Sequence, residues 1–215
     1  MKRTKFKAYT RFAEVYDLMG GDRFSEKMVE YTFGLLKKFK YQPRNILELC
    51  CGTGTAAIMF AEQGYEVSGL DGSEYMLTAA RYKAKKKKLK IPFYHQKLPN
   101  IGISRGKSKE LEKFDLVTCF YDSLNYILDE TKLAESFKRV NQHLVDDGLF
   151  IFDMNTFYAL KYLWGAKTYA DSLDDIAWIW KTITYEKARQ ADLRAVFFLK
   201  KGNLITHSVI PLLFR

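Results

Sequence analysis

Short apolar runs alternate with longer amphipathic stretches over residues 9–160 of the chain. The apolar runs predict buried strands at 46–49, 66–70, 92–96, 115–120 and 149–153. Apolar residues three or four positions apart predict helices at 9–19, 26–39, 55–63, 73–88 and 129–144. Strands that alternate with helices predict an α/β fold with a doubly wound, mainly parallel sheet and a ligand at the carboxyl ends of the strands.

The pattern changes after Tyr162. Three β-prone runs follow at 176–185, 195–200 and 204–213, and Lys201-Gly202-Asn203 gives a turn signal between the last two. These runs predict a small antiparallel β cover after the fifth strand of the main sheet. The chain is therefore expected to have a larger α/β part followed by a smaller β-rich part.

Residues 45–57 carry the candidate ligand site. An apolar run that holds Glu48 breaks into the turn Gly52-Thr53-Gly54, and a helical pattern follows at once. Glycine tolerates positive φ and lets a ligand approach the backbone, and the start of a helix offers unpaired N–H groups. The next apolar run ends in Asp71, whose carboxylate can bind the two hydroxyls of a ribose. We therefore expect a nucleoside-bearing cofactor across the ends of the first two strands.

The same turn fits the loose G-x-G-x-x-(G/A) pattern of dinucleotide binders, which is weak evidence alone. Glu48, however, stands where a cationic group is favoured and a pyrophosphate is not. The block 48–54 resembles motif I of class I S-adenosylmethionine-dependent methyltransferases, with Cys50 in place of the first glycine. Further segments resemble motifs of that family in the right order: 70–77, 114–120, 122–126 and 148–156.

The resemblance implies a Rossmann-like fold, S-adenosylmethionine as the cofactor, and a set of residue roles. Asp71 would accept hydrogen bonds from the ribose hydroxyls, and Glu48 would hold the ammonium of the methionine part. The remaining implied cofactor contacts are Tyr9, Tyr16, Cys50, Gly52, Gly54, Gly72, Met76, Leu98 and Phe120.

Methyl transfer from a sulfonium is an in-line displacement, so the protein mainly positions and desolvates the reactants. A nucleophilic triad is not required. If a general base exists, the candidates by position at the mouth of the site are Tyr121, Asp122, Asp153 and Asn155, of which we select Tyr121 and Asp122. Tyr16, Asp153 and Asn155 are expected to face the methyl acceptor.

We expect a cofactor-binding domain with N-terminal lid helices over 1–162 and a β cover subdomain over 163–215. The resembled family normally continues with a further helix and two strands, for which the residues after Pro211 leave no room. The interpretation is either a truncated form or a chain whose run 208–214 replaces an edge strand. The unpaired sheet edge that an early stop leaves favours self-association.

Composition narrows the class of protein. The chain has 215 residues, 47% of them hydrophobic, which suits one packed domain with a small appendage. No apolar run is long enough to span a membrane, and the basic N-terminus lacks the apolar core of a secretory signal. Three cysteines without ligand spacing predict no metal site and a reduced cytosolic (cytoplasmic) setting.

The formal net charge of +10 is concentrated locally. The basic residues of the main run are Arg81, Lys83, Lys85, Lys86, Lys87, Lys88 and Lys90. Such a patch indicates RNA or another polyanion as a partner. A solvated helix end explains the same run, and we favour it because no aromatic stacking surface is expected among these residues.

Four functions remain open. We favour a methyltransferase that acts on nitrogen or oxygen of a small-molecule acceptor. An RNA methyltransferase that uses the basic patch comes second. A non-catalytic binding module is third and rests on the absent last strands, Cys50 and Lys97, which stands where the family more often has an acidic residue. A nicotinamide-dependent oxidoreductase is last.

Overall fold

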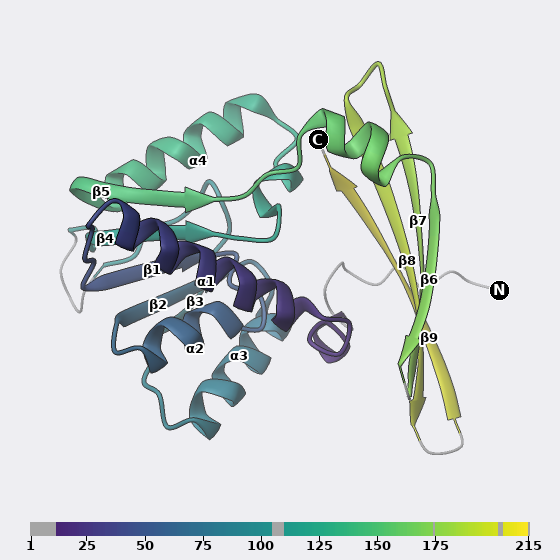
Figure 1. Cartoon of the computed structure of the whole chain (residues 1–215), viewed down its shortest axis with the longest axis horizontal. Coiled ribbons are helices and arrows are strands. Elements are labelled where there is room, and N and C mark those ends of the chain that lie inside the picture. Colours follow the sequence, from purple (N-terminus) through teal and green to yellow (C-terminus); the bar gives the residue numbers. More distant parts are fainter. Residues whose placement is uncertain (1–11, 105–109, 174, 202–203, 215) are drawn as a thin grey trace.

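The computed structural model describes residues 12–104, 110–173, 175–201 and 204–214, with the side chains of Glu14 and of the residues after Lys200 left out. Its centre is a five-stranded parallel sheet in the order β3-β2-β1-β4-β5 (Figure 1). The strands are β1 Asn45–Leu49, β2 Glu66–Asp71, β3 Phe93–His95, β4 Phe114–Cys119 and β5 Leu144–Phe152. The predicted α/β fold with a parallel sheet is therefore confirmed.

Helices cover both faces of this sheet. They are α1 Gly21–Lys38, α2 Thr55–Glu62, α3 Glu74–Lys86 and α4 Glu130–His143. Along β1 the side chains alternate, because successive strand residues point to opposite faces. Ile46 packs with α1 and α2, whereas Leu47 and Leu49 pack in the cluster that includes Val140 of α4.

The register of the sheet brings its functional ends together. Leu49 pairs with Leu70 of β2 on one side and with Cys119 of β4 on the other. The carboxyl ends of β1, β2, β4 and β5 therefore meet along one side of the sheet, which we call the carboxyl edge.

A second, antiparallel sheet stands beyond the carboxyl edge (Figure 1). Its strands, in the order β6-β7-β8-β9, are β6 Thr168–Leu173, β7 Ile176–Tyr185, β8 Gln190–Lys201 and β9 Leu204–Phe214. The predicted β cover is thus confirmed. A shared apolar cluster joins it to the short helical turns η1 Phe12–Glu14 and η3 Ala159–Trp164 and to the start of α3.

Several predicted elements differ from the structure for identifiable reasons. The helix predicted at 9–19 is a short 3₁₀ turn at Phe12–Glu14 followed by hydrogen-bonded turns, and 9–11 lie outside the described residues. Strand β6 was not predicted because all its side chains are exposed, so it carries no alternation of apolar and polar residues. The strand predicted at 149–153 begins earlier, at Leu144, and its register with β4 shifts between Phe114 and Leu116.

The last β-prone run does not add a strand to the main sheet. β9 pairs antiparallel with β8, so the alternative in which 208–214 replaces an edge strand of the parallel sheet is wrong. Among the described residues, β5 ends the parallel sheet on that side. Within the same part of the chain, no helix combines the length and the apolar character needed to cross a membrane.

Replacing Phe60 tests how much the core between α1, α2 and the sheet contributes to the free energy of unfolding. Its side chain is fully buried against Phe33 and Phe120. We expect Phe60→Ala to lower the free energy of unfolding by about 3–5 kcal/mol, because it removes buried apolar surface and leaves a cavity. Urea denaturation measures the change. Phe39→Ala, at a ring that is 66% exposed, is the control and should change stability by less than about 0.5 kcal/mol.

Candidate functional site

The turn after β1 has the backbone shape of a ligand-binding loop. Cys50, Gly52 and Gly54 all have positive φ, at 52°, 53° and 76°. At Gly54 a side chain is excluded, because a Cβ would lie 2.8 Å from the Cβ of Ala80 on α3. Cys50 adopts the left-handed conformation although it is not glycine, which costs roughly 1–2 kcal/mol. The turn therefore keeps the glycine-like path at the position where the resembled motif has its first glycine.

Asp71 holds this turn from the end of β2. Its Oδ2 accepts a hydrogen bond from the N–H of Gly52 at 2.9 Å, and its Oδ1 accepts one from the N–H of Ser73 at 2.7 Å. Burial raises the pKa of Asp71, and these hydrogen bonds oppose the rise because they favour the charged form. Each carboxylate oxygen has a further lone pair, so Asp71 can still accept ribose hydroxyls.

Glu48 is a buried acid near the end of β1 and faces the first turn of α2. Its residue is 4% exposed, and its carboxylate accepts a hydrogen bond from the N–H of Ala57. Among the described residues, its Oε2 has no hydrogen-bond partner although it is buried. Burial raises the pKa of Glu48 to about 8. An orphaned buried carboxylate oxygen fits the ammonium of a bound cofactor, since such atoms are rarely left unpaired.

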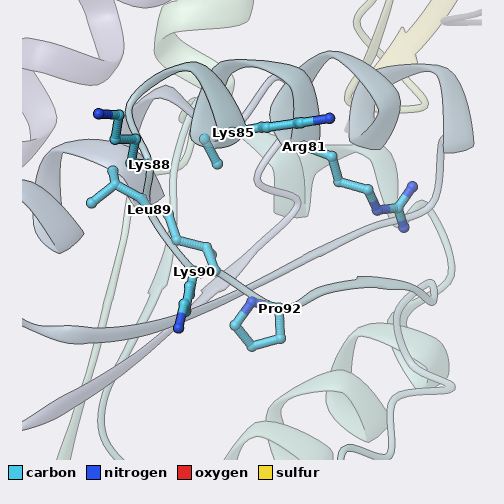
Figure 2. A pocket seen from close by; sticks show the side chains of 8 residues that line it. Arg81, Lys85, Lys88, Leu89, Lys90 and Pro92 are labelled. Atoms are coloured by element: carbon cyan, nitrogen blue, oxygen red, sulfur yellow. The ribbon is translucent and has the colours of Figure 1, made fainter.

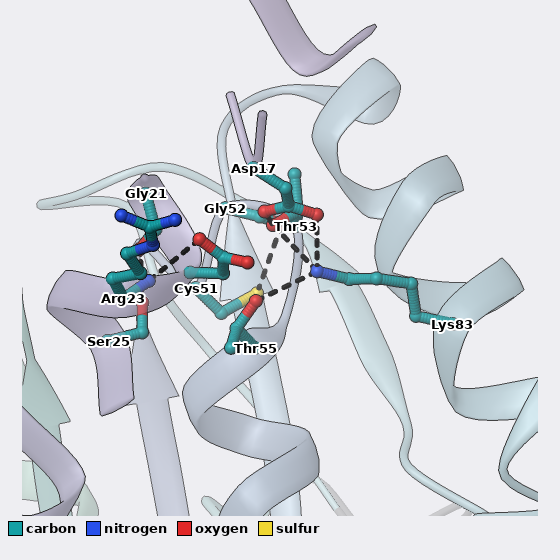
Figure 3. Close-up of polar contacts among 10 residues, drawn as sticks. Asp17, Gly21, Arg23, Ser25, Cys51, Gly52, Thr53, Thr55 and Lys83 are labelled. Carbon is teal, nitrogen blue, oxygen red and sulfur yellow. Dashed lines mark hydrogen bonds and ion pairs between the residues drawn. The ribbon is translucent and has the colours of Figure 1, made fainter. Parts of the chain in front are cut away.

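A polar latch ties the N-terminal segment to the turn (Figure 3). The Lys83 Nζ donates to Asp17 Oδ2 at 2.7 Å, to Thr53 Oγ1 at 3.0 Å and to Thr55 Oγ1 at 2.8 Å. Thr53 Oγ1 in turn donates to Asp17 Oδ1 at 2.6 Å. We call these four residues the latch: Asp17, Thr53, Thr55 and Lys83. The sequence analysis did not identify the latch, because Asp17 and Lys83 are far from the turn along the chain. Lys83 was assigned there to the basic run.

Aromatic rings pack beside the turn. The centre of the Tyr16 ring lies 5.2 Å from the centre of the Phe12 ring and 5.6 Å from that of the Tyr121 ring. The ring centres of Phe24 and Tyr121 are 4.4 Å apart. Gly21 makes room for Tyr16, because a Cβ there would lie 2.5 Å from the Tyr16 ring. Burial raises the pKa of Tyr121 to about 12. Tyr121 is therefore a hydroxyl donor at neutral pH and a weak candidate for the general base that the sequence suggested.

Asp122 and Asp153 place two carboxylates near each other at the ends of β4 and β5. The N–H of Asp122 donates to Asp153 Oδ2 at 2.8 Å, and Asn155 Nδ2 donates to Asp122 Oδ2 at 2.6 Å. Burial and the charge of Asp153 raise the pKa of Asp122 to about 7. Asp153 Oδ1 is buried without a hydrogen-bond partner among the described residues. Asp122 also has a positive φ of 48°, which is uncommon for aspartate and frequent at functional sites.

Asn125 and Trp164 support this cluster, and the sequence analysis did not identify them. Asn125 Nδ2 donates to the carbonyl of Asn155 at 3.0 Å, and its Oδ1 accepts the N–H of Asn155 at 2.9 Å. The Trp164 Nε1 donates to Asn155 Oδ1 at 3.4 Å. Asn155 is therefore hydrogen-bonded to Asp122, to Asn125 and to Trp164 of η3, the helical turn before the cover sheet. A side-chain amide that hydrogen-bonds the backbone of a residue distant in the chain cannot be recognised from residue type or spacing in a single sequence.

The other residues expected to contact the cofactor lie in separate surroundings. Met76 is buried in the cluster below the cover sheet, Leu98 packs with Ile101 and Ile103 on the α4 side, and Phe120 packs near Phe60 on the α1–α2 side. The aliphatic part of the Lys97 side chain lies over Gly72, because a Cβ added to Gly72 would be 3.5 Å from the Lys97 Cβ. Tyr9 lies outside the described residues.

Comparisons with known proteins agree on one family. A family model described as a methyltransferase domain matches residues 46–148. A protein of Geobacillus sp. (strain WCH70), named as a candidate methyltransferase, is 29% identical over 193 residues, which cover 89% of this chain and 75% of that protein. A crystal structure of an S-adenosylmethionine-dependent methyltransferase from Clostridium acetobutylicum ATCC 824 is 28% identical, with a TM-score of 0.82 over 96% of this chain and 81% of the other.

A more distant relative has a named substrate. The dTDP-3-amino-3,4,6-trideoxy-alpha-D-glucopyranose N,N-dimethyltransferase of Streptomyces venezuelae is 24% identical over 164 residues, which cover 74% of this chain and 60% of that enzyme.

The latch makes a testable contribution to local order. We expect Lys83→Met to speed hydrogen–deuterium exchange about fivefold at the amides of Met19, Gly20 and Gly21, because a partly buried ion pair contributes roughly 1 kcal/mol to holding that segment. Lys86→Met, an exposed change three residues along the helix, is the control. Equal exchange in the two variants would show that the latch does not order the segment.

Proposed function

Because this chain belongs to the class I S-adenosylmethionine-dependent methyltransferases, we propose that it transfers a methyl group to the nitrogen of a small-molecule amine. The acidic pair Asp122 and Asp153 at the carboxyl edge carries this proposal. Glu48 and Asp71 add two further carboxylates along the same edge. A cluster of carboxylates attracts cations, and both the cofactor and a protonated amine are cations.

The residues of the carboxyl edge fit the cofactor. Glu48 would hold the ammonium of its methionine part, and Asp71 would accept the ribose hydroxyls while it continues to hold Gly52. The rings of Tyr16 and Tyr121 would lie over the bound group and exclude water. When bound, S-adenosylmethionine supplies a methyl group on a positively charged sulfur, which leaves with the electron pair of the broken carbon–sulfur bond.

Asp122 is our candidate for the group that takes the proton from the acceptor nitrogen. Its pKa of about 7 lies near neutral pH, where a general base is most effective. Asn155 orients it, and Asp153 anchors its backbone. The Tyr121 hydroxyl oxygen would accept a hydrogen bond from the acceptor ammonium, which is a donor only. Residues 163–215, as a cover subdomain, would shape the acceptor pocket above this pair.

The choice of nitrogen over oxygen follows from charge. A neutral hydroxyl gains little from a nearby carboxylate pair before it reacts, whereas an ammonium is bound by it and then deprotonated. The amino sugar named for the Streptomyces venezuelae relative is consistent with an amine acceptor.

Asp122→Asn tests the proposed base. We expect kcat with an amine acceptor to fall about 100-fold, because an amide cannot take the proton. Transfer of tritiated methyl groups from S-adenosylmethionine to a panel of primary and secondary amines measures kcat, and calorimetry with S-adenosylhomocysteine should give an unchanged Kd. Asp146→Asn, at an exposed carboxylate of β5, is the matched control. In the wild type, kcat/KM should rise with pH up to about 7, and this rise should disappear in Asp122→Asn. Methylation of alcohols alone would contradict the proposal.

The raised pKa of Glu48 leads us to expect that cofactor binding depends on pH. Its pKa in the folded protein, about 8, lies well above the ordinary value of a glutamate, so its negative charge, and with it the attraction for an ammonium, increases as pH rises through 8. We expect the Kd of S-adenosylhomocysteine to fall between pH 6.5 and 8.5, and Glu48→Gln to remove this change. Glu62→Gln, at an exposed carboxylate of α2, should keep it. A folded wild type that does not bind S-adenosylhomocysteine would instead favour a non-catalytic binding module.

A further inference from the structure

An open groove lies at the end of α3, away from the carboxyl edge (Figure 2). Its volume is about 510 Å³, and its lining residues are Arg81, Ala84, Lys85, Lys88, Leu89, Lys90, Ile91 and Pro92. We call it the α3 groove. Its lining combines the apolar residues Ala84, Leu89, Ile91 and Pro92 with four cationic side chains, which extend in different directions (Figure 2).

The basic residues of this region divide into two groups. Three of them are neutralised within the protein, since Arg81 pairs with Glu74, Lys83 with Asp17 and Lys87 with Glu62. The other four, Lys85, Lys86, Lys88 and Lys90, are exposed and form no ion pair with the described acidic residues. Of these, Lys86 lies over the Tyr82 ring, and Lys85, Lys88 and Lys90 line the groove. The uncompensated positive charge is thus concentrated at the groove.

An exposed aromatic ring stands beside these lysines. Tyr82 is 59% exposed, and the Lys86 Nζ lies 4.9 Å from the centre of its ring. Tyr82 and Lys85 are three residues apart on α3 and are therefore neighbours on the helix surface. The sequence analysis expected no aromatic stacking surface among these residues, and the structure leaves the ring of Tyr82 exposed between them.

We propose that the α3 groove binds single-stranded RNA. Lys85, Lys88 and Lys90 would contact successive phosphates, and an unpaired base would stack on Tyr82. A membrane fits this surface less well. Leu89 and Ile91 are only partly exposed, and Tyr82 is the one large hydrophobic side chain described as exposed between 81 and 92. An inserted apolar anchor is therefore missing from that stretch.

The groove is separate from the proposed reaction site. Helix α3 begins just after Asp71 and ends at the groove, and its 13 residues span about 20 Å at 1.5 Å per residue. Nucleotides held in the groove would therefore lie at the far end of α3 from the carboxyl edge and not at the acidic pair itself. The binding proposal therefore stands or falls independently of amine methylation.

Fluorescence anisotropy with a labelled 20-nucleotide single-stranded RNA tests the proposal on the full chain. The variant Lys85→Gln/Lys88→Gln/Lys90→Gln should bind at least tenfold more weakly than wild type. The slope of log K against log salt should become less steep by about 2, since each lost phosphate contact on a single strand removes about 0.7. The control Lys37→Gln/Lys132→Gln/Lys138→Gln removes the same charge from exposed positions on α1 and α4 and should change the affinity less than twofold.

Tyr82→Ala separates RNA from other polyanions. It should weaken RNA binding about fivefold or more through lost stacking, and leave the binding of inorganic polyphosphate unchanged. Thermal denaturation and S-adenosylhomocysteine affinity report whether the variants stay folded, and single substitutions replace the triple variant if it does not. Equal losses in both triple variants, no loss in the groove variant, or a silent Tyr82→Ala would overturn the proposal. So would stronger binding to phosphatidylserine vesicles than to RNA.

Discussion

The two hydrogen bonds that Asp71 accepts from Gly52 and Ser73 hold the carboxyl edge together. The bond from Gly52 joins the end of β2 to the turn after β1, and the bond from Ser73 fixes the residue before α3. The turn in its place sets where α2 begins and therefore where the N–H of Ala57 meets Glu48. Because the backbone orients the carboxylate of Asp71 in advance, little conformational entropy remains to be lost there when a ligand binds.

Residues 12–20, before α1, are held to the turn and to the cover sheet by two different interactions. The latch binds Asp17 through charge, whereas Phe12 and Val15 are buried with residues of β7 and β8 in an apolar cluster. Met76 belongs to the same cluster, so the start of α3 also supports the cover sheet. Residues 12–16, the start of α3 and strands β7 and β8 thus share one apolar cluster.

The fold was largely predictable because buried parallel strands are apolar along their length and end in recognisable turns. Glu48 and Asp71 lie at strand ends as their positions in the pattern predicted. The latch could not be predicted, since Asp17 and Lys83 meet only through tertiary packing. Strand β6 could not be predicted either, because an exposed edge strand buries no face. The positive φ of Tyr121 and Asp122 likewise has no signature in residue type.

The arrangement of charge gives the molecule a marked electrical asymmetry. The chain carries a formal net charge of +10, yet carboxylates gather at the carboxyl edge while unpaired lysines gather at the far end of α3. A charge distribution of this kind produces a dipole whose field extends about a Debye length, near 8–10 Å, into physiological salt. Small cations are therefore drawn to one end of the protein and anions to the other, so the two kinds of ligand do not compete for the same approach.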